Sequence, residues 1–452
     1  MAVKWKKLGD VPESKMTPML RQYVQAKAEC PDSILFFRMG DFFEMFFEDA
    51  IEAAELLGLT LTSRDGSDSE DRVPMCGVPY RTVDTYVARA IKGGRTVTIC
   101  DQMEDPKLAK GIVKRAVVRT ITPGTVMEPD LLDATSNNYL GALWLEDGRA
   151  GIAFVDVSTG EFLAAQVEDD VQRAIEDELT RMAPSEVLVS NAMDKALIDR
   201  LERRFDGVRF APRGDDTFDA AFARQLLLDQ FGLSTLKGVD LENAREATAA
   251  AGAILSYVNE TQRDAVPHLR LPRRYSPAGY VVLDGNTQRN LELIESLADK
   301  KKRGTLLGVL DRTQTSMGGR KLRHWILHPL IDVAEIRARL DSVEELAGAG
   351  ELRLELKELF RGVADLERLL SRLTSKAGNA RDVKALGRSI EEVPGIKAAL
   401  GGIEAPMLST LRDGMDELRD VAEWIARAVV DEPPLPITEG NILKSGYHEE
   451  LD

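Results

Sequence analysis

The sequence predicts a multidomain protein in which two successive α/β domains precede an all-helical domain. A length of 452 residues suits roughly three domains at a typical size of about 150 residues. Two Pro/Gly-rich stretches, Thr122–Asn137 and Val266–Tyr280, interrupt the chain and indicate linkers, because proline ends helices. The strand and helix patterns change at these stretches, which predicts domains at residues 1–125, 126–270 and 271–452.

The first domain alternates short strands and helices. We expect a strand at Ile34–Arg38, a turn over Met39–Asp41 and a second strand at Phe42–Phe46. Further expected elements are a helix in EDAIEAAELLG, a helix in TVDTYVARAIKGG that its two final glycines end, and a strand in RTVTICDQ. This alternation predicts an α/β domain.

Three consecutive strand candidates open the second domain, with Gly, Asp, Ser and Thr in the turns between them. They are YLGALWL, GIAFVDV and EFLAAQ. A helix (DVQRAIEDELTRM), a strand (EVLVS) and more helix follow. The order βββαβα predicts a sheet flanked by helices, as in the ribonuclease H-like fold.

The third domain is predicted to be helical. ELRLELKELFRGVADLERLLSRLTS places apolar residues three and four positions apart, with charged residues between them. We interpret these mixed charges as a solvated face. Long amphipathic helices with short links are typical of a bundle or lever that holds distance rather than performs chemistry.

The composition excludes several classes of protein. No apolar run approaches the roughly 20 residues of a membrane span, and no apolar secretory segment follows the basic N-terminus. Three cysteines cannot form a disulfide framework, which indicates the reducing cytosol.

The sequence holds few patterns for catalysis. It has no GxxxxGK[ST] phosphate loop, no HExxH and no paired CxxC. His324 and His328 could share a helix face, and we interpret them as structural or surface residues. Asp156, at a strand end before Ser-Thr-Gly, resembles the opening of a ribonuclease H-type nuclease, which needs several carboxylates around two metal ions. Only Glu161 could join it, so a plain hairpin turn is favoured and a metal-dependent nuclease remains the alternative.

Six of the 14 phenylalanines crowd into positions 36–47. Alternate strand residues face opposite sides, so Phe42, Glu44 and Phe46 share one face while Phe43 and Met45 share the other. If one face is core, the other presents an aromatic ring two residues from a carboxylate. Spacing alone favours phenylalanines that are all buried, with a ligand site as the alternative.

The charge is unevenly distributed. The net charge is -16, yet residues 1–125 hold 18 Lys and Arg against 18 Asp and Glu. Within them, Pro106–Met127 carries five cations and no acid. A domain that faces nucleic acid is one interpretation, because cations supply affinity for phosphates. Charge alone favours the other, which is ordinary solvated charge.

Several collinear motifs resemble the MutS family of bacterial DNA mismatch-repair sensors. They are RMGDFFEMFFEDA, MCGVPYRTVDTYVARAI, CDQMEDP and RTITPGT in the first domain, VDVSTGEF in the second, and LDGNTQRNLELIES, LLGVLDRTQTSMGGRKLRHWILHPL and DLERLLSRL in the third. The resemblance spans essentially all 452 residues. It implies a mismatch-recognition domain, a connector domain and an incomplete core and lever domain that stops at the start of the family's clamp insertion.

The resemblance also implies roles for individual residues. Phe42 and Glu44 match the residues that read a mismatch, the ring as a wedge at a kinked site. Residues expected to support the wedge or contact the DNA backbone are Arg38, Met39, Gly40, Asp41, Lys107, Lys110, Lys114, Arg115 and Arg119. We expect no catalytic residue, cofactor or metal in this chain, with ATP and Mg²⁺ bound only by the full-length protein. Expected partners are mismatched double-stranded DNA, a second subunit in a homodimer of the full-length protein, and MutL, in the cytoplasm at the nucleoid and without a membrane.

Overall fold

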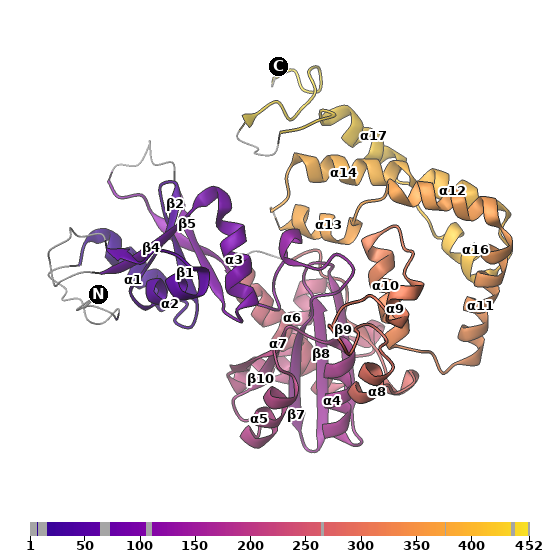
Figure 1. Ribbon diagram of the computed structural model, residues 1–452, viewed down its shortest axis with the longest axis horizontal. Helices are drawn as coiled ribbons and strands as arrows, with labels where there is room; N and C mark the ends of the chain where they lie inside the picture. The colour runs from indigo at the N-terminus through magenta and orange to yellow at the C-terminus, as the bar shows by residue number, and fades with distance from the viewer. Residues whose placement is uncertain are drawn as a thin grey trace.

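Two six-stranded sheets with flanking helices precede a helical region (Figure 1). The computed structural model describes residue 7 and residues 16–63, 73–104, 111–263, 266–375, 377–434 and 439–450. This architecture confirms the predicted fold class, whereas the domain boundaries remain predictions. No helix in these ranges is long and apolar enough to cross a membrane.

The first sheet has the strand order β3-β4-β2-β1-β5-β6. Its strands are β1 (Ile34–Met39), β2 (Phe42–Phe46), β3 (Thr62–Ser63), β4 (Pro74–Pro79), β5 (Val97–Gln102) and β6 (Arg115–Ile121). Only β1 and β5 pair in parallel, and all other neighbours are antiparallel. The expected strands appear as β1, β2 and β5, while β4 and β6 were not predicted.

Helices cover both faces of the first sheet. Helix α1 (Pro18–Ala28) packs on the face that carries Phe37 and Phe46. Helices α2 (Phe47–Leu57) and α3 (Val83–Lys92), which were predicted, pack on the face that carries Phe36 and Phe43. Both faces of the sheet are therefore core, as expected from the interpretation that the crowded phenylalanines are buried.

The buried carboxylate of Asp49 ties the first sheet to two helices. Asp49, in α2, accepts hydrogen bonds from the Lys27 ammonium at 2.8 Å, the Tyr23 hydroxyl at 2.9 Å and the Leu35 amide at 3.0 Å. Burial and the Asp49 charge raise the pKa of Tyr23 well above its ordinary value. The strands that carry the phenylalanines are thus held by one charge-assisted network.

The second sheet has the order β11-β10-β7-β8-β9-β12. Its strands are β7 (Leu140–Glu146), β8 (Arg149–Asp156), β9 (Glu161–Val167), β10 (Glu186–Ser190), β11 (Arg209–Arg213) and β12 (Arg273–Arg274). β7, β8 and β9 form an antiparallel meander, and β10 and β11 extend it in parallel from β7. This is the strand order that the ribonuclease H-like prediction requires.

Two helical layers enclose the second sheet. α6 (Ala220–Phe231) and α7 (Arg245–Gln262) cover one face, and α4 (Val171–Met182) and α5 (Lys195–Arg204) cover the other. Helix α7 is rich in alanine and lies very close to the sheet, because a Cβ on Gly151 would stand 1.8 Å from the Glu246 carbonyl oxygen. Only glycine fits at that crossing.

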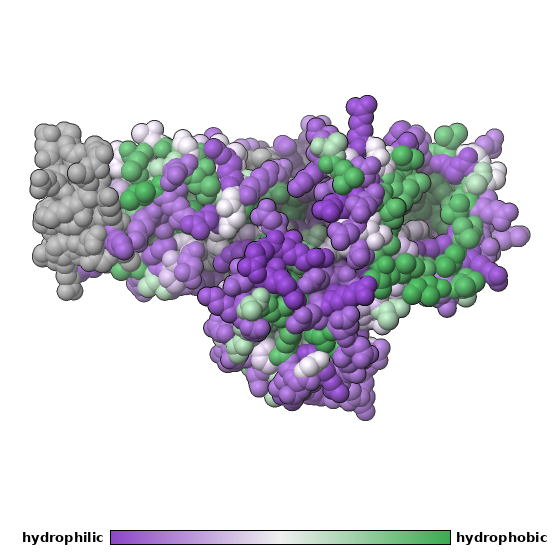
Figure 2. All heavy atoms as spheres, turned by 60° about the horizontal axis from the view of Figure 1, so that its bottom comes forward, coloured by the Kyte–Doolittle hydropathy of each residue, from purple (hydrophilic) through white to green (hydrophobic). Residues whose placement is uncertain are grey.

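The helical region is extended and leaves several large apolar side chains exposed. Its helices are α8 (Gly285–Asn290), α9 (Leu306–Leu310), α10 (Ser316–Leu327), α11 (Val333–Gly348), α12 (Gly350–Arg361), α13 (Leu366–Thr374), α14 (Ala380–Glu391), α15 (Val393–Ala399), α16 (Pro406–Asp413) and α17 (Arg419–Ala428). Figure 2 shows hydrophobic side chains over this region, where Leu340 and Leu354 are 60% and 66% exposed. The arrangement is that of a lever rather than a closed bundle.

The prediction of a solvated face was wrong for one charge of α13. Arg368 is buried and donates to the carbonyl oxygens of Asp133 at 2.9 Å and Ser136 at 2.8 Å. Arg320 of α10 donates to both carboxylate oxygens of Asp365, at 2.7 and 2.8 Å. Asp365 also accepts from the Arg368 amide as the N-cap of α13.

His324 and His328 stack at the end of α10 and are structural, as predicted. Their ring centroids lie 3.9 Å apart, and a ring nitrogen of His328 is 2.9 Å from the His324 carbonyl oxygen. Burial lowers the pKa of His324 to about 3 and that of His328 to about 4. Both rings are therefore neutral at physiological pH.

Replacing Asp49 with alanine should destabilise the first sheet by about 3 kcal/mol, because Lys27 and Tyr23 lose their buried partner. The measurement is amide hydrogen exchange of β1 and α2, which reports local opening. Glu48→Ala, on the exposed neighbour in the same helix, should change protection by less than about 0.5 kcal/mol. Equal protection in the two variants would contradict the role of Asp49.

The histidine pair should make the protein less stable as the pH falls. Because the folded pKa values lie below the ordinary value near 6.5, the unfolded chain binds more protons between about pH 6.5 and pH 4. Each ring should contribute about 1 kcal/mol per pH unit in that window. The wild type should therefore lose more thermal stability between about pH 7 and pH 5 than the His324→Gln, His328→Gln double variant. An equal loss of thermal stability in the wild type and the double variant would contradict this.

Candidate nucleic-acid interface

One end of the first sheet brings together the connections that the sequence singles out. The β1–β2 turn lies there, and β4 ends beside it because Phe42 pairs with Pro79. The parallel pairing of β1 with β5 carries the end of β5 to the same side. The hairpin between β5 and β6, in which the basic stretch begins, therefore extends from the end of the sheet that carries Phe42.

The β1–β2 turn is a tight two-residue hairpin. Met39 pairs with Phe42 across it, and only Gly40 of the two central residues has a positive φ, +59°. This pattern is typical of a type II′ turn, which favours glycine at its first central position. The Tyr80 amide donates to the Asp41 carbonyl oxygen at 2.8 Å, which secures the turn to the end of β4.

Phe42 is the exception among the crowded phenylalanines. The other five are at most 2% exposed, whereas Phe42 is 48% exposed. Its position explains the difference, because it begins β2 at the sheet end, beyond the helices that cover the rest of the strand. The favoured expectation that all six rings are buried was therefore wrong for Phe42.

Glu44 lies on the same strand face as Phe42 and is half-buried. Its cross-strand partners are Phe37 in β1 and Gly77 in β4. A Cβ on Gly77 would stand 3.6 Å from the Glu44 Cγ and 3.3 Å from the Phe43 carbonyl oxygen. The absence of a side chain at Gly77 thus leaves room for the Glu44 carboxylate on the face that carries Phe42.

Arg38 and Tyr80 form a second group at this sheet end, where both lie over the ring of Phe43 on the face opposite Phe42. The Arg38 guanidinium carbon lies 3.3 Å from the centroid of the Tyr80 ring, a cation–π contact, and its Nε donates to the Gly40 carbonyl oxygen. Tyr80 is 45% exposed. It was not predicted as a site residue, because the pairing of β4 with β2 is not visible in the sequence.

The remaining predicted residues differ in their availability to a ligand. Lys114 is exposed, and Met39 packs against the core beneath α1. Arg115 is engaged inside the protein, because its Nε donates to the Arg38 carbonyl oxygen at 2.6 Å and its guanidinium lies over Phe37. Arg119 forms an ion pair with Glu128. Lys107 and Lys110 lie outside the described residues.

Exposed apolar residues extend this surface along the β5–β6 hairpin. Met103 is 60% exposed and Ile112 is 48% exposed, and neither was selected from the sequence. Arg81, beside Tyr80, is an exposed cation. The sheet end thus combines apolar side chains with cations, which suits a ligand that has both flat rings and negative charges.

The Asp156 region does not have the features of a nuclease site. Asp156 is fully buried, and its carboxylate accepts from the Ser158 hydroxyl at 2.7 Å, the Ser158 amide at 2.9 Å and the Asn137 side chain at 2.8 Å. Glu161 accepts from the Tyr139 hydroxyl at 2.6 Å. The part of the chain that the structure describes contains no cluster of three or more metal-ligating side chains. The hairpin-turn interpretation holds, and nothing supports the nuclease.

Family models match almost the whole chain. MutS domain I matches residues 17–130, MutS domain II matches residues 138–270, and MutS domain III matches residues 286–451. The three matches follow the two sheets and the helical region in order.

Curated relatives give the same result. This chain is 44% identical to the DNA mismatch repair protein MutS of Symbiobacterium thermophilum over 441 residues, which are 97% of this chain and 50% of that protein. It is 42% identical to the protein of the same name from Myxococcus xanthus, over 97% of this chain and 49% of the relative. The chain spans about half the length of these relatives.

Proposed function

Because this chain belongs to the MutS family, we propose that it recognises mispaired or looped double-stranded DNA through the sheet end that carries Phe42 and Glu44. The observation that carries this proposal is the exposure of Phe42, at 48%, in a cluster whose other rings are all buried. An exposed ring on a rigid strand end is suited to stacking on a base.

The wedge acts through the deformability of the DNA. Kinking and unstacking a normal duplex costs a few kcal/mol per step, with about 1–6 kcal/mol more for bending. A mispair has already lost part of its stacking and pairing, so the same deformation costs less there. Stacking of a base on an aromatic ring returns about 1–3 kcal/mol for any base. Phe42 therefore detects weak sites and not a particular sequence.

Glu44 adds discrimination against normal DNA. A carboxylate repels phosphates, and it is desolvated when a duplex covers the sheet end. A mispaired base that donates a hydrogen bond to Glu44 offsets this cost, whereas a paired base leaves a penalty of about 1–3 kcal/mol. Glu44 thus weakens binding to perfectly paired DNA more than binding to mismatched DNA.

The surrounding residues position the wedge and the DNA backbone. Gly40 and Asp41 form the turn that presents Phe42, and Arg38 and Met39 end the strand before it. Lys107, Lys110 and Lys114 contact phosphates, which orients the duplex without reading its sequence. Arg115 and Arg119 support these contacts from within the domain, through the hydrogen bond to Arg38 and the ion pair with Glu128.

The complete family protein provides the further steps. We assign homodimer formation, MutL binding and an ATPase that uses Mg²⁺ to the full-length protein in the cytoplasm, at the nucleoid. The sequence has no GxxxxGK[ST] phosphate-binding loop, so we assign no step that uses ATP to the residues of this chain.

Phe42→Ala should abolish the preference for mismatched DNA. Loss of one base–aromatic contact should weaken binding to a duplex with a single G·T mispair about tenfold or more, with little change for the perfect duplex. Fluorescence anisotropy at low ionic strength measures both affinities. The control is Phe222→Ala, which removes a ring that is 51% exposed on α6. An unchanged affinity ratio in Phe42→Ala would falsify the wedge.

Glu44→Ala should raise the affinity for perfect duplex about fivefold or more, because the desolvation penalty disappears. The affinity for the G·T duplex should rise less, so selectivity falls in the same anisotropy assay. Glu44→Gln separates charge from hydrogen bonding, since it removes the charge and keeps the shape. Equal gains for both duplexes would mean that Glu44 acts only by general repulsion.

A further inference from the structure

A small cavity lies where α4 of the second sheet meets α10 of the helical region. Its volume is about 80 Å³, several times the roughly 10–15 Å³ that one water requires. The described residues that line it include no carboxylate. Its ionisable lining residues, apart from Tyr139, are Arg181, Arg320, Arg323, His324 and His328.

Arg181 brings one unused hydrogen-bond donor to this cavity. The residue is 2% exposed, and its Nη1 is paired with a carboxylate oxygen of Glu178 at 2.7 Å. Its Nε has no acceptor among the described residues. A buried donor without an acceptor is costly, so it indicates room for an oxygen ligand.

Arg323 adds a cation that has no hydrogen-bonded partner among the described residues. It extends from α10, and within the described ranges its guanidinium makes no hydrogen bond or ion pair. Burial lowers its pKa, which reflects the cost of holding this charge away from water, while the charges of Glu295 and Asp133 raise it. Arg320, in contrast, is fully occupied by Asp365, Glu367 and the Ala134 carbonyl oxygen.

The surroundings of the cavity are electropositive. Burial and the neighbouring His328 ring lower the pKa of His324, and the cations Lys321, Arg273 and Arg339 lower it further. Arg181 and Lys321 likewise lower the pKa of His328. A positive potential in a partly dry site favours an anion strongly.

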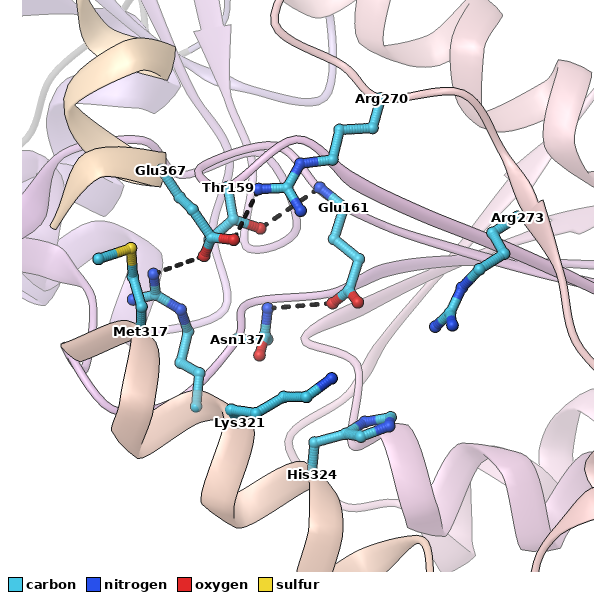
Figure 3. A pocket seen from close by; sticks show the side chains of 10 residues that line it. Asn137, Thr159, Glu161, Arg270, Arg273, Met317, Lys321, His324 and Glu367 are labelled. Carbon is cyan, nitrogen blue, oxygen red and sulfur yellow. Dashed lines mark hydrogen bonds and ion pairs between the residues drawn. The ribbon is translucent and has the colours of Figure 1, made fainter. Parts of the chain in front are cut away.

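A wider pocket of about 130 Å³ adjoins the cavity and shares Asn137, Arg320 and His324 with it. Figure 3 shows Lys321 and His324, on α10, on one side of this pocket and Arg273 on another. Arg270 is paired with Glu367 at 2.6 Å, but the side chains of Lys321 and Arg273 make no ion pair with any described residue. The pocket is thus an entrance to the cavity that is lined by cations together with two carboxylates, Glu161 and Glu367.

We propose that this cavity binds a phosphate-sized oxyanion that bridges Arg181 and Arg323. A guanidinium group presents its N–H donors in a planar fork that matches oxyanion geometry. The anion would accept from the Arg181 Nε, which lacks a partner among the described residues, and from the guanidinium of Arg323, which makes no hydrogen bond within them. The chemical class is inorganic phosphate or the phosphate group of a monoester, whose remaining part would occupy the entrance pocket.

The position of the site gives the anion a structural consequence. Arg181 belongs to the second sheet's helix α4, and Arg323 belongs to α10 of the helical region. An anion held by both side chains would join these two parts of the protein. The inference does not depend on mismatch recognition, because it concerns a different region and needs no DNA.

Isothermal titration of this chain with inorganic phosphate, against sodium chloride at equal ionic strength, tests the site. The wild type should bind one phosphate per chain, and Arg323→Gln should weaken that binding at least tenfold. Arg303→Gln is the matched control, because it removes an exposed cation from the same region. Titration with adenosine monophosphate distinguishes the two sources, since only a site that admits an ester would bind it.

Thermal unfolding provides a second readout. Without phosphate, Arg323→Gln should be at least as stable as the wild type, because a half-buried charge that makes no hydrogen bond or ion pair within the described residues has been removed. With phosphate, the wild type and Arg303→Gln should gain stability and Arg323→Gln should not. Binding no tighter than to chloride, or equal phosphate binding by the wild type and Arg323→Gln, would overturn the proposal.

Discussion

The parallel pairing of β1 with β5 is the constraint on which the candidate interface depends. In an otherwise antiparallel sheet, this one pair carries the end of β5 to the same side as the β1–β2 turn. Antiparallel pairing of β2 with β4 then adds Tyr80. A sheet in which β5 ran in the opposite direction would place the basic hairpin at the far end from Phe42. The apolar and cationic parts of the surface meet only because of this topology.

Because helices cover both faces of the first sheet, the exposure of the Phe42 ring needs an explanation other than packing. With α1 on one face and α2 and α3 on the other, aromatic side chains along β1 and β2 are buried whichever way they point. Burying such a ring contributes about 1.5–3 kcal/mol, which Phe42 largely forgoes at the sheet end. The turn there is nevertheless tied to β4, because the Tyr80 amide donates to the Asp41 carbonyl oxygen. An exposed ring at this position is therefore a feature of the fold that stability alone does not account for.

Local sequence patterns predicted the elements but not their partners. The strands at Ile34–Arg38 and Phe42–Phe46, and the βββαβα order of the second domain, follow from periodicity and turn residues, which are local signals. Tyr80 and Arg115 could not be interpreted in this way, because their contacts depend on the register of strands distant in sequence. Arg368 was misassigned for a similar reason, since a charge on a helix looks solvated until the neighbouring domain is in place.

The segment between the two sheets is held by buried polar contacts along its length. At its start, Glu186 accepts from the Gly124 amide at 3.1 Å and also from the Tyr257 hydroxyl at 2.9 Å. Further along, Arg368 and Arg320 bind the carbonyl oxygens of residues 133–136. Breaking a buried charged contact of this kind costs about 3–5 kcal/mol. The orientation of the domain that carries Phe42 is thus set by the second sheet and the helical region together, because the linker that positions it is bound to both.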